Sequence, residues 1–186
     1  MPDSNLTKKA LASAMKELMT ERPFQKISVG DICERCGMNR KSFYYHFIDK
    51  YDLVNWIFYT EFVSTLSARD AYTGWGILRD ACTYLYENRR FYANALTITG
   101  QNAFSDYFAS LLRPLITYQM SDLLAGDENI EFYQTFFSDA FIMSVRRWLT
   151  ENPDMNADTY VTLLKNAMLG LAESSLRQSH LGRDKE

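Results

Sequence analysis

The sequence contains few of the residues from which catalytic and metal sites are built. It has two histidines, His46 and His180, and three cysteines among 186 residues, and an odd number of cysteines does not suit a disulfide framework. It also has no Gly-rich phosphate loop, no G-x-S-x-G motif and no H-E-x-x-H motif. We therefore expect no catalytic residues, no metal site and no cofactor, and an enzyme is not the expected class.

Long apolar runs are missing as well. No stretch approaches the ~18 uninterrupted apolar residues of a membrane span, and the first five residues are polar with no early apolar run after them. These features predict a cytoplasmic protein without a membrane segment. The hydrophobic content of 47% is enough for a substantial core in one large or two small domains.

Cys33 and Cys36 form a C-x-x-C pair, which raises the possibility of a metal or redox site. A metal site would need two more ligands, but Cys82 is remote and His46 is expected on a different face. A redox role would need a βαβ context, which the sequence does not offer. Packing as small buried apolar side chains is the favoured interpretation.

The periodicity of the apolar residues is helical throughout, and no segment alternates with period two for long enough to form a strand. A first helix is expected at residues 5–20, ending before Pro23. Gly74-Trp75-Gly76 is expected to break the chain, and Pro114 should kink or split a helix at 102–124. Further helices are expected at 77–88, 89–99, 129–150 and from 158 onward. The sequence thus predicts an all-α fold of about nine helices.

Residues 28–50 predict two short helices joined by a tight turn. Ser28 and Asp31 fit a capping box that starts the first of them, Gly37 suits a turn with positive φ, and Asn39 can cap the second. Phe43 and Phe47 are four residues apart and should both point into a core. This arrangement has the spacing of a helix-turn-helix.

The outward face of the second helix carries cations, a hydroxyl, phenols and an imidazole, which suit phosphates and base edges. An ordinary solvated surface is the alternative, but two cations in the first turn of a helix oppose the macrodipole, and a nearby polyanion would offset that cost. Residues 1–50 hold nine Lys/Arg and six Asp/Glu (+3), whereas residues 51–186 hold eleven and seventeen (−6). The expected DNA-binding residues are Ser28, Arg40, Lys41, Ser42, Tyr44, Tyr45, His46 and Lys50.

The chain carries FQKISV at residues 24–29, CGMN at 36–39, FYYHF at 43–47 and Asp49-Lys50. Together these segments resemble the TetR family of bacterial transcription regulators. Two further segments resemble the branch of the family associated with dihydroxyacetone kinase operons: NRKSFYYHFIDKYDLVNWI and RRFYANALTITGQNAFSDYF. The resemblance implies a homodimer on a palindromic double-stranded DNA operator, with Lys50 touching the DNA backbone. It also implies a DNA-binding domain at 1–50, a connecting fourth helix at 51–68, and a helical regulatory and dimerisation domain at 69–186.

Residues 69–186 carry the features expected of a regulatory and dimerisation domain. A broad apolar arc on the 129–150 helix predicts a homodimer interface formed by the last two helices. A small-molecule effector is expected at Tyr92, Asn94, Gln101, Asn102 and Tyr107, because polar groups gather there near a helix break. A protein effector remains the alternative, as does an interaction module whose DNA-binding part is vestigial.

Overall fold

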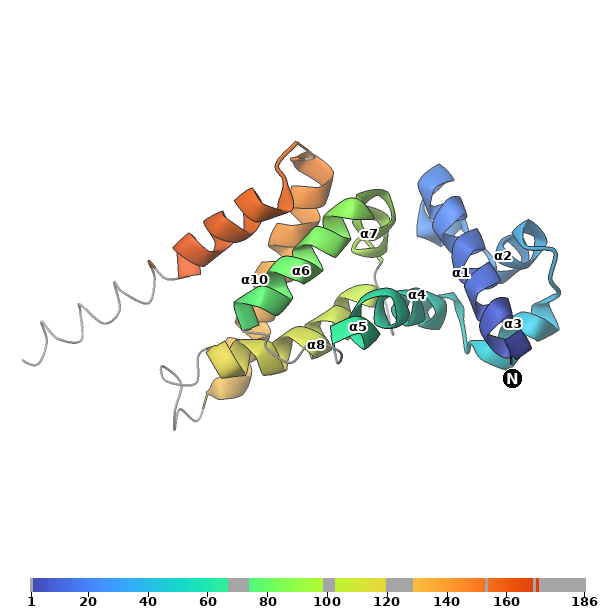
Figure 1. Cartoon of the computed structure of the whole chain (residues 1–186), viewed down its shortest axis with the longest axis horizontal. Coiled ribbons are helices and arrows are strands. Elements are labelled where there is room, and N and C mark those ends of the chain that lie inside the picture. Colours follow the sequence, from blue (N-terminus) through green and yellow to red (C-terminus); the bar gives the residue numbers. More distant parts are fainter. Residues whose placement is uncertain are drawn as a thin grey trace, which may run out of the picture.

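The structure is a computed structural model that describes residues 2–66, 74–98, 103–119, 129–152, 154–168 and 170. Every regular element in these ranges is a helix, so the prediction of an all-α fold is confirmed. Figure 1 shows α1, α2 and α3 grouped at one end, here called the head. α6, α7, α8, α10 and the helix at 157–168 form the body, and α4 runs between the two groups.

The head consists of α1 (Pro2–Glu21), the 3-10 turn η1 (Phe24–Lys26), α2 (Val29–Arg35) and α3 (Arg40–His46). Its core is built from one apolar face of each helix, because amphipathic helices of this length are stabilised mainly by packing. The fully or nearly fully buried side chains are Leu11, Met15, Leu18, Met19, Phe24, Ile27, Ile32, Phe43 and Phe47. Leu11, Met15, Leu18 and Met19 follow helical spacing and form the buried stripe of α1.

α4 (Lys50–Phe58) continues as the π-helical segment η2 (Tyr59–Val63) and the short α5 (Ser64–Leu66). Phe58 anchors this connection to the body, since its ring centroid lies 5.4–6.0 Å from those of four aromatic residues of the body: Tyr84, Tyr92, Phe104 and Phe108. The core is therefore continuous from head to body. The division at residues 50 and 69 into separate domains stays a prediction.

The body consists of α6 (Gly74–Glu87), α7 (Arg89–Ala95), α8 (Phe104–Gln119), α10 (Ile130–Glu151) and the helix at 157–168. The expected break at Gly74-Trp75-Gly76 was wrong, because these residues form the first turn of α6. α8 runs through Pro114, so the chain is not split there, and a kink at this proline stays a prediction. α8 packs along α10, and none of the described helices is long and apolar enough to cross a membrane.

Candidate functional site

The helix-turn-helix is fixed by side chains that bond within a few residues of themselves. The Ser28 hydroxyl accepts from the backbone N–H of Asp31 at 3.2 Å, and the Asp31 carboxylate accepts from the backbone N–H of Ser28 at 2.7 Å. This reciprocal pair is the predicted capping box, and it holds the pKa of Asp31 below its usual range. Gly37 has φ 67° and turns the chain, and Asn39 caps α3 by accepting from the N–H of Ser42 at 2.8 Å.

Because Phe43 and Phe47 are buried, α3 presents its opposite face to solvent. Lys41 lies exposed on this face, Arg40 is exposed at the first turn of the helix, and the exposed fractions of Tyr44 and Tyr45 are 58% and 80%. Of the other predicted DNA-binding residues, Ser28, Ser42, His46 and Lys50 have partners inside the head: Ser28 in the capping box, Ser42 on Asn39, His46 against the Tyr45 ring, and Lys50 on backbone carbonyls. Their contacts with DNA stay predictions.

Ile48, which is not among the predicted DNA-binding residues, is 82% exposed between α3 and α4. A large aliphatic group this exposed costs free energy in water, and it lies directly beyond the aromatic face of α3. Thymine methyl groups and deoxyribose edges are the apolar parts of DNA that such a side chain can cover. The signal in the sequence was an isoleucine placed between Phe47 and the N-cap Asp49, in a connection too short to bury it.

Arg40 lies across the first turn of α2. A β-carbon placed on Gly30 would approach Nη2 of Arg40 to 2.6 Å and Nε to 3.3 Å, so any larger residue would displace the guanidinium. Burial raises the pKa of Cys33, and the charge of the nearby Arg40 acts in the opposite direction. The absence of a side chain at Gly30 therefore provides room for the guanidinium of Arg40.

The cysteine pair is built into the head. Cys33 is buried, and Cys36 donates its S–H to the carbonyl of Ile32 at 3.2 Å. Burial raises the pKa of both thiols, which keeps them protonated at neutral pH. Within the described residues no group of three or more His, Cys, Asp or Glu side chains is placed to hold a metal ion.

Two of the predicted effector residues, Asn94 and Tyr92, direct their polar atoms to partners inside the protein. Asn94 directs its carboxamide into the head, and Tyr92 is fully buried with its hydroxyl donating to that of Tyr84 at 3.0 Å. Tyr84 in turn donates to Glu61 at 2.6 Å, and Glu61 also pairs with Lys16 of α1 at 2.7 Å. Head and core groups thus occupy the polar atoms of Asn94 and Tyr92, and an effector role for these two residues stays a prediction. Gln101 and Asn102 lie outside the described residues.

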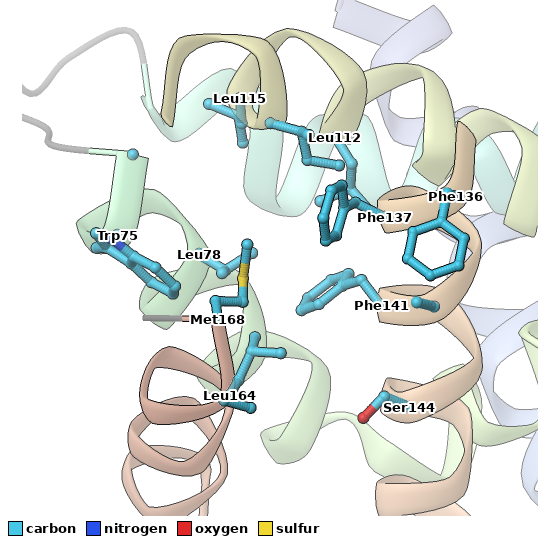
Figure 2. A pocket seen from close by; sticks show the side chains of 14 residues that line it. Trp75, Leu78, Leu112, Leu115, Phe136, Phe137, Phe141, Ser144, Leu164 and Met168 are labelled. Carbon is cyan, nitrogen blue, oxygen red and sulfur yellow. The ribbon is translucent and has the colours of Figure 1, made fainter. Parts of the chain in front are cut away.

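A cavity of about 360 Å³ lies elsewhere in the body, between α6, α8, α10 and the helix at 157–168. Tyr107, on α8, is not among its lining residues. Figure 2 shows Trp75, Leu78, Leu112, Phe137, Phe141 and Met168 around this space, with Ser144 at one side. Ser144 already accepts from the hydroxyl of Tyr160 at 2.9 Å. Apart from this hydroxyl and the indole N–H of Trp75, the lining side chains are hydrocarbon or thioether, which suits an apolar guest.

Comparison with known proteins assigns both parts of the chain. A model described as bacterial regulatory proteins of the tetR family matches residues 11–57, and one described as a transcriptional regulator C-terminal region matches residues 75–170. Over 99 residues the chain is 34% identical to the HTH-type dhaKLM operon transcriptional activator DhaS of Lactococcus lactis subsp. lactis (strain IL1403). That match spans 53% of this chain and 53% of the relative, about half the length of each.

Three solved structures share the fold. One titled dihydroxyacetone kinase operon activator DhaS has a TM-score of 0.64 and 23% identity, covering 89% of this chain and 95% of that one. A TetR transcriptional regulator from Streptococcus agalactiae 2603V has a TM-score of 0.66 and 21% identity, covering 87% and 95%. Native NalD, the secondary repressor of the MexAB-OprM multidrug efflux pump in Pseudomonas aeruginosa, has a TM-score of 0.60 and 21% identity, covering 90% and 96%.

Proposed function

Because the chain belongs to the TetR family of transcriptional regulators, we propose that it is a homodimer that binds a palindromic DNA operator through α3 of each subunit. The observation that carries this proposal is the exposed face of α3, where Arg40, Lys41, Tyr44 and Tyr45 stand out from a helix anchored on its other side by Phe43. Arg40 and Lys41, with Ser42, would read base edges, while Tyr44, Tyr45, His46 and Lys50 would mainly position phosphates.

Dimerisation is supported by α10 and the helix after it. Phe132 and Phe136 are 65% and 55% exposed and their rings stack at 6.1 Å, while Met143 and Leu163 are 49% and 53% exposed. Phe132, Phe136 and Met143 share one face of α10, opposite the buried Phe141 and Val145. A contiguous apolar face of this kind marks an interaction surface. A two-fold contact between two copies would place two recognition helices about one DNA turn, ~34–36 Å, apart.

The cavity of Figure 2 is the proposed effector site. Its lining offers no charged group to a ligand, so the effector would be an uncharged, largely apolar molecule. The relative named as the activator of the dhaKLM operon makes a dihydroxyacetone kinase operon the first candidate target. Dihydroxyacetone itself, with hydrogen-bonding groups on every carbon, would leave those groups unpaired in this cavity.

A protein effector is the second candidate. The exposed fractions of Tyr118 on α8 and Tyr59 on η2 are 72% and 52%. Exposed tyrosines of this kind are enriched at protein interfaces. This version places the regulatory contact on the outer surface of α8 rather than in the cavity.

Selection of bound duplexes from a random DNA library by the purified full-length protein tests the central proposal. Palindromic sites should be enriched, and the variant Arg40→Ala should lose roughly 1–3 kcal/mol of preference at one base pair in each half-site. Lys50→Ala, at a position assigned to phosphates, should weaken binding to all sequences more evenly. If no sequence were enriched and affinity depended on salt alone, the proposal of a specific operator would fail.

A further inference from the structure

The carboxamide of Asn94 joins the body to the head through three hydrogen bonds. From α7, its Nδ2 donates to the carbonyls of Met19 and Arg22, each at 3.0 Å, and its Oδ1 accepts from the N–H of Phe24 at 3.0 Å. Both amide hydrogens and the oxygen are thus used on backbone groups that lie at least 70 residues away in the chain. A side chain satisfied in this way has one orientation available to it.

The sequence around Pro23 explains why the head needs this partner. In an α-helix the carbonyl of Met19 would accept from the N–H of residue 23. Residue 23 is proline and has no N–H, so the last turn of α1 leaves that carbonyl open. Arg22 still donates to the carbonyl of Leu18 at 3.0 Å, and the helix ends there. Asn94 therefore caps α1 from a different part of the molecule.

The contact continues toward the recognition helix through Phe24. Its N–H is held by Asn94 of the body, and its carbonyl accepts from the Lys50 ammonium at 2.9 Å. Lys50 is the first residue of α4, and three residues separate it from the end of α3. The fully buried Phe24 ring also contacts Tyr51 at 4.9 Å. A polar path thus runs from α7 through η1 to the start of α4.

We propose that Asn94 is a positioning residue that fixes the orientation of the helix-turn-helix on the body, and with it the spacing of the two recognition helices. This inference rests on the proposed homodimeric operator binding. Without the carboxamide, the apolar contacts between α1 and α7 remain but lose their directional restraint, since hydrophobic packing is not directional. The head would then occupy a range of orientations, and full operator affinity would fall while each head stayed folded.

The test compares Asn94→Ala with the parent on operators whose half-site spacing is native, one base pair shorter or one base pair longer. The variant should bind an isolated half-site like the parent. It should bind the native operator roughly tenfold more weakly, which corresponds to ~1.4 kcal/mol, and should discriminate less between the three spacings. Asn88→Ala is the matched control, because the Asn88 side chain donates only to the carbonyl of Tyr84 within the body. It should keep the parent's preference for spacing.

A second substitution separates positioning from simple capping. Pro23→Ala restores an N–H that can bond the carbonyl of Met19 inside α1. If Asn94 only capped the helix, the double variant Pro23→Ala/Asn94→Ala would regain the spacing preference, and the inference would be overturned. It would equally be overturned if Asn94→Ala kept that preference by itself. Continued loss of spacing preference in the double variant supports it.

A distance measurement tests whether Asn94 fixes the orientation of the head even if the parent binds no DNA. Absence of DNA binding by the parent would contradict the proposed function, not the role of Asn94. Spin labels on Glu34→Cys of the head and Thr135→Cys of α10, in a chain with its native cysteines replaced by alanine, report the orientation of the head by pulsed electron paramagnetic resonance. Asn94→Ala should broaden the distribution of distances relative to the parent. An unchanged distribution would contradict the role assigned to Asn94.

Discussion

The ammonium group of Lys50 donates a 2.9 Å hydrogen bond to the carbonyl of Phe24 and lies 4.1 Å from the centre of the ring of the same residue. It donates a second bond, of 2.7 Å, to the carbonyl of Ile27. Burial lowers the pKa of Lys50, while the charge of Asp31 acts in the opposite direction. Lys50 therefore fastens the turn before α2 to the start of α4, whether or not a phosphate later binds it.

Lys50→Ala is consequently expected to lower head stability as well as DNA affinity. Two carbonyls lose a charged donor, and hydrogen bonds to charged groups each contribute about 1.5–3 kcal/mol. Thermal unfolding should show the loss, and a salt titration of DNA binding should show a slope flatter by roughly one unit if Lys50 also meets a phosphate. Lys41→Ala, at an exposed position, should flatten the slope without changing the unfolding midpoint. A Lys50→Ala protein as stable as its parent would contradict the fastening role.

The capping box predicts a pH dependence. The N–H and hydroxyl of Ser28, followed by the charge of Arg22, hold the pKa of Asp31 below its usual range. A carboxyl group with a lowered folded-state pKa contributes stability that is full above the unfolded pKa, about 3.9, and is lost as the pH falls through the folded value. Asp31→Asn should therefore lower the melting temperature most near neutral pH, and the difference from the parent should shrink in acid. Glu34→Gln, on the exposed face of the same helix, should have a smaller effect at pH 7; equal effects would argue against the box.

The contact between Gly30 and Arg40 predicts a change of specificity without loss of stability. Alanine is preferred over glycine within a helix by roughly 0.5–1 kcal/mol, and the clash at 2.6 Å is with the end of a flexible side chain. Gly30→Ala should thus leave thermal stability equal or higher while the guanidinium moves and base preference at one operator position changes. In an Arg40→Ala background, Gly30→Ala should leave the base preference unchanged. A shift of preference that persisted there would exclude Arg40 as the cause.

The local features of the head were predictable because each acts within a few residues of itself. The Ser28 box, the positive φ of Gly37 and the Asn39 cap follow from short-range hydrogen bonding and sterics, and all three are confirmed. The role of Asn94 was not predictable, since its partners lie at least 70 residues away and become relevant only once α7 packs on α1. Pro114 shows the same limit: packing against α10 outweighs its local tendency to break α8.

The apolar face of α10 predicts how the dimer can be disrupted. Met143→Glu would place two carboxylates near each other across a two-fold axis and remove an apolar side chain whose burial stabilises by about 1.5–3 kcal/mol. Because Met143 is half exposed in the single chain, the monomer should stay folded. Sedimentation should then show a dimer dissociation constant at least roughly tenfold higher, with operator affinity falling in parallel. Thr135→Glu, exposed on the flank of the same helix, should remain dimeric, and dissociation of both variants alike would remove the assignment of this face.

The chemistry of the cavity predicts which molecules it admits. N-phenyl-1-naphthylamine, an uncharged apolar fluorophore, should bind with increased fluorescence, because its rings exchange water for the aromatic and aliphatic lining in Figure 2. Leu78→Trp fills part of this space from α6 and should weaken binding by at least roughly tenfold, ~1.4 kcal/mol, while the protein still binds its operator. Glu87→Trp, at the exposed end of α6, adds the same ring outside the cavity and should bind the fluorophore like the parent. Dihydroxyacetone should not displace the fluorophore, since its hydroxyl and carbonyl groups would be buried without enough partners. Displacement by dihydroxyacetone, or full binding by Leu78→Trp, would show that the cavity is not an apolar effector site and would leave a protein on the outer surface of α8 as the better candidate.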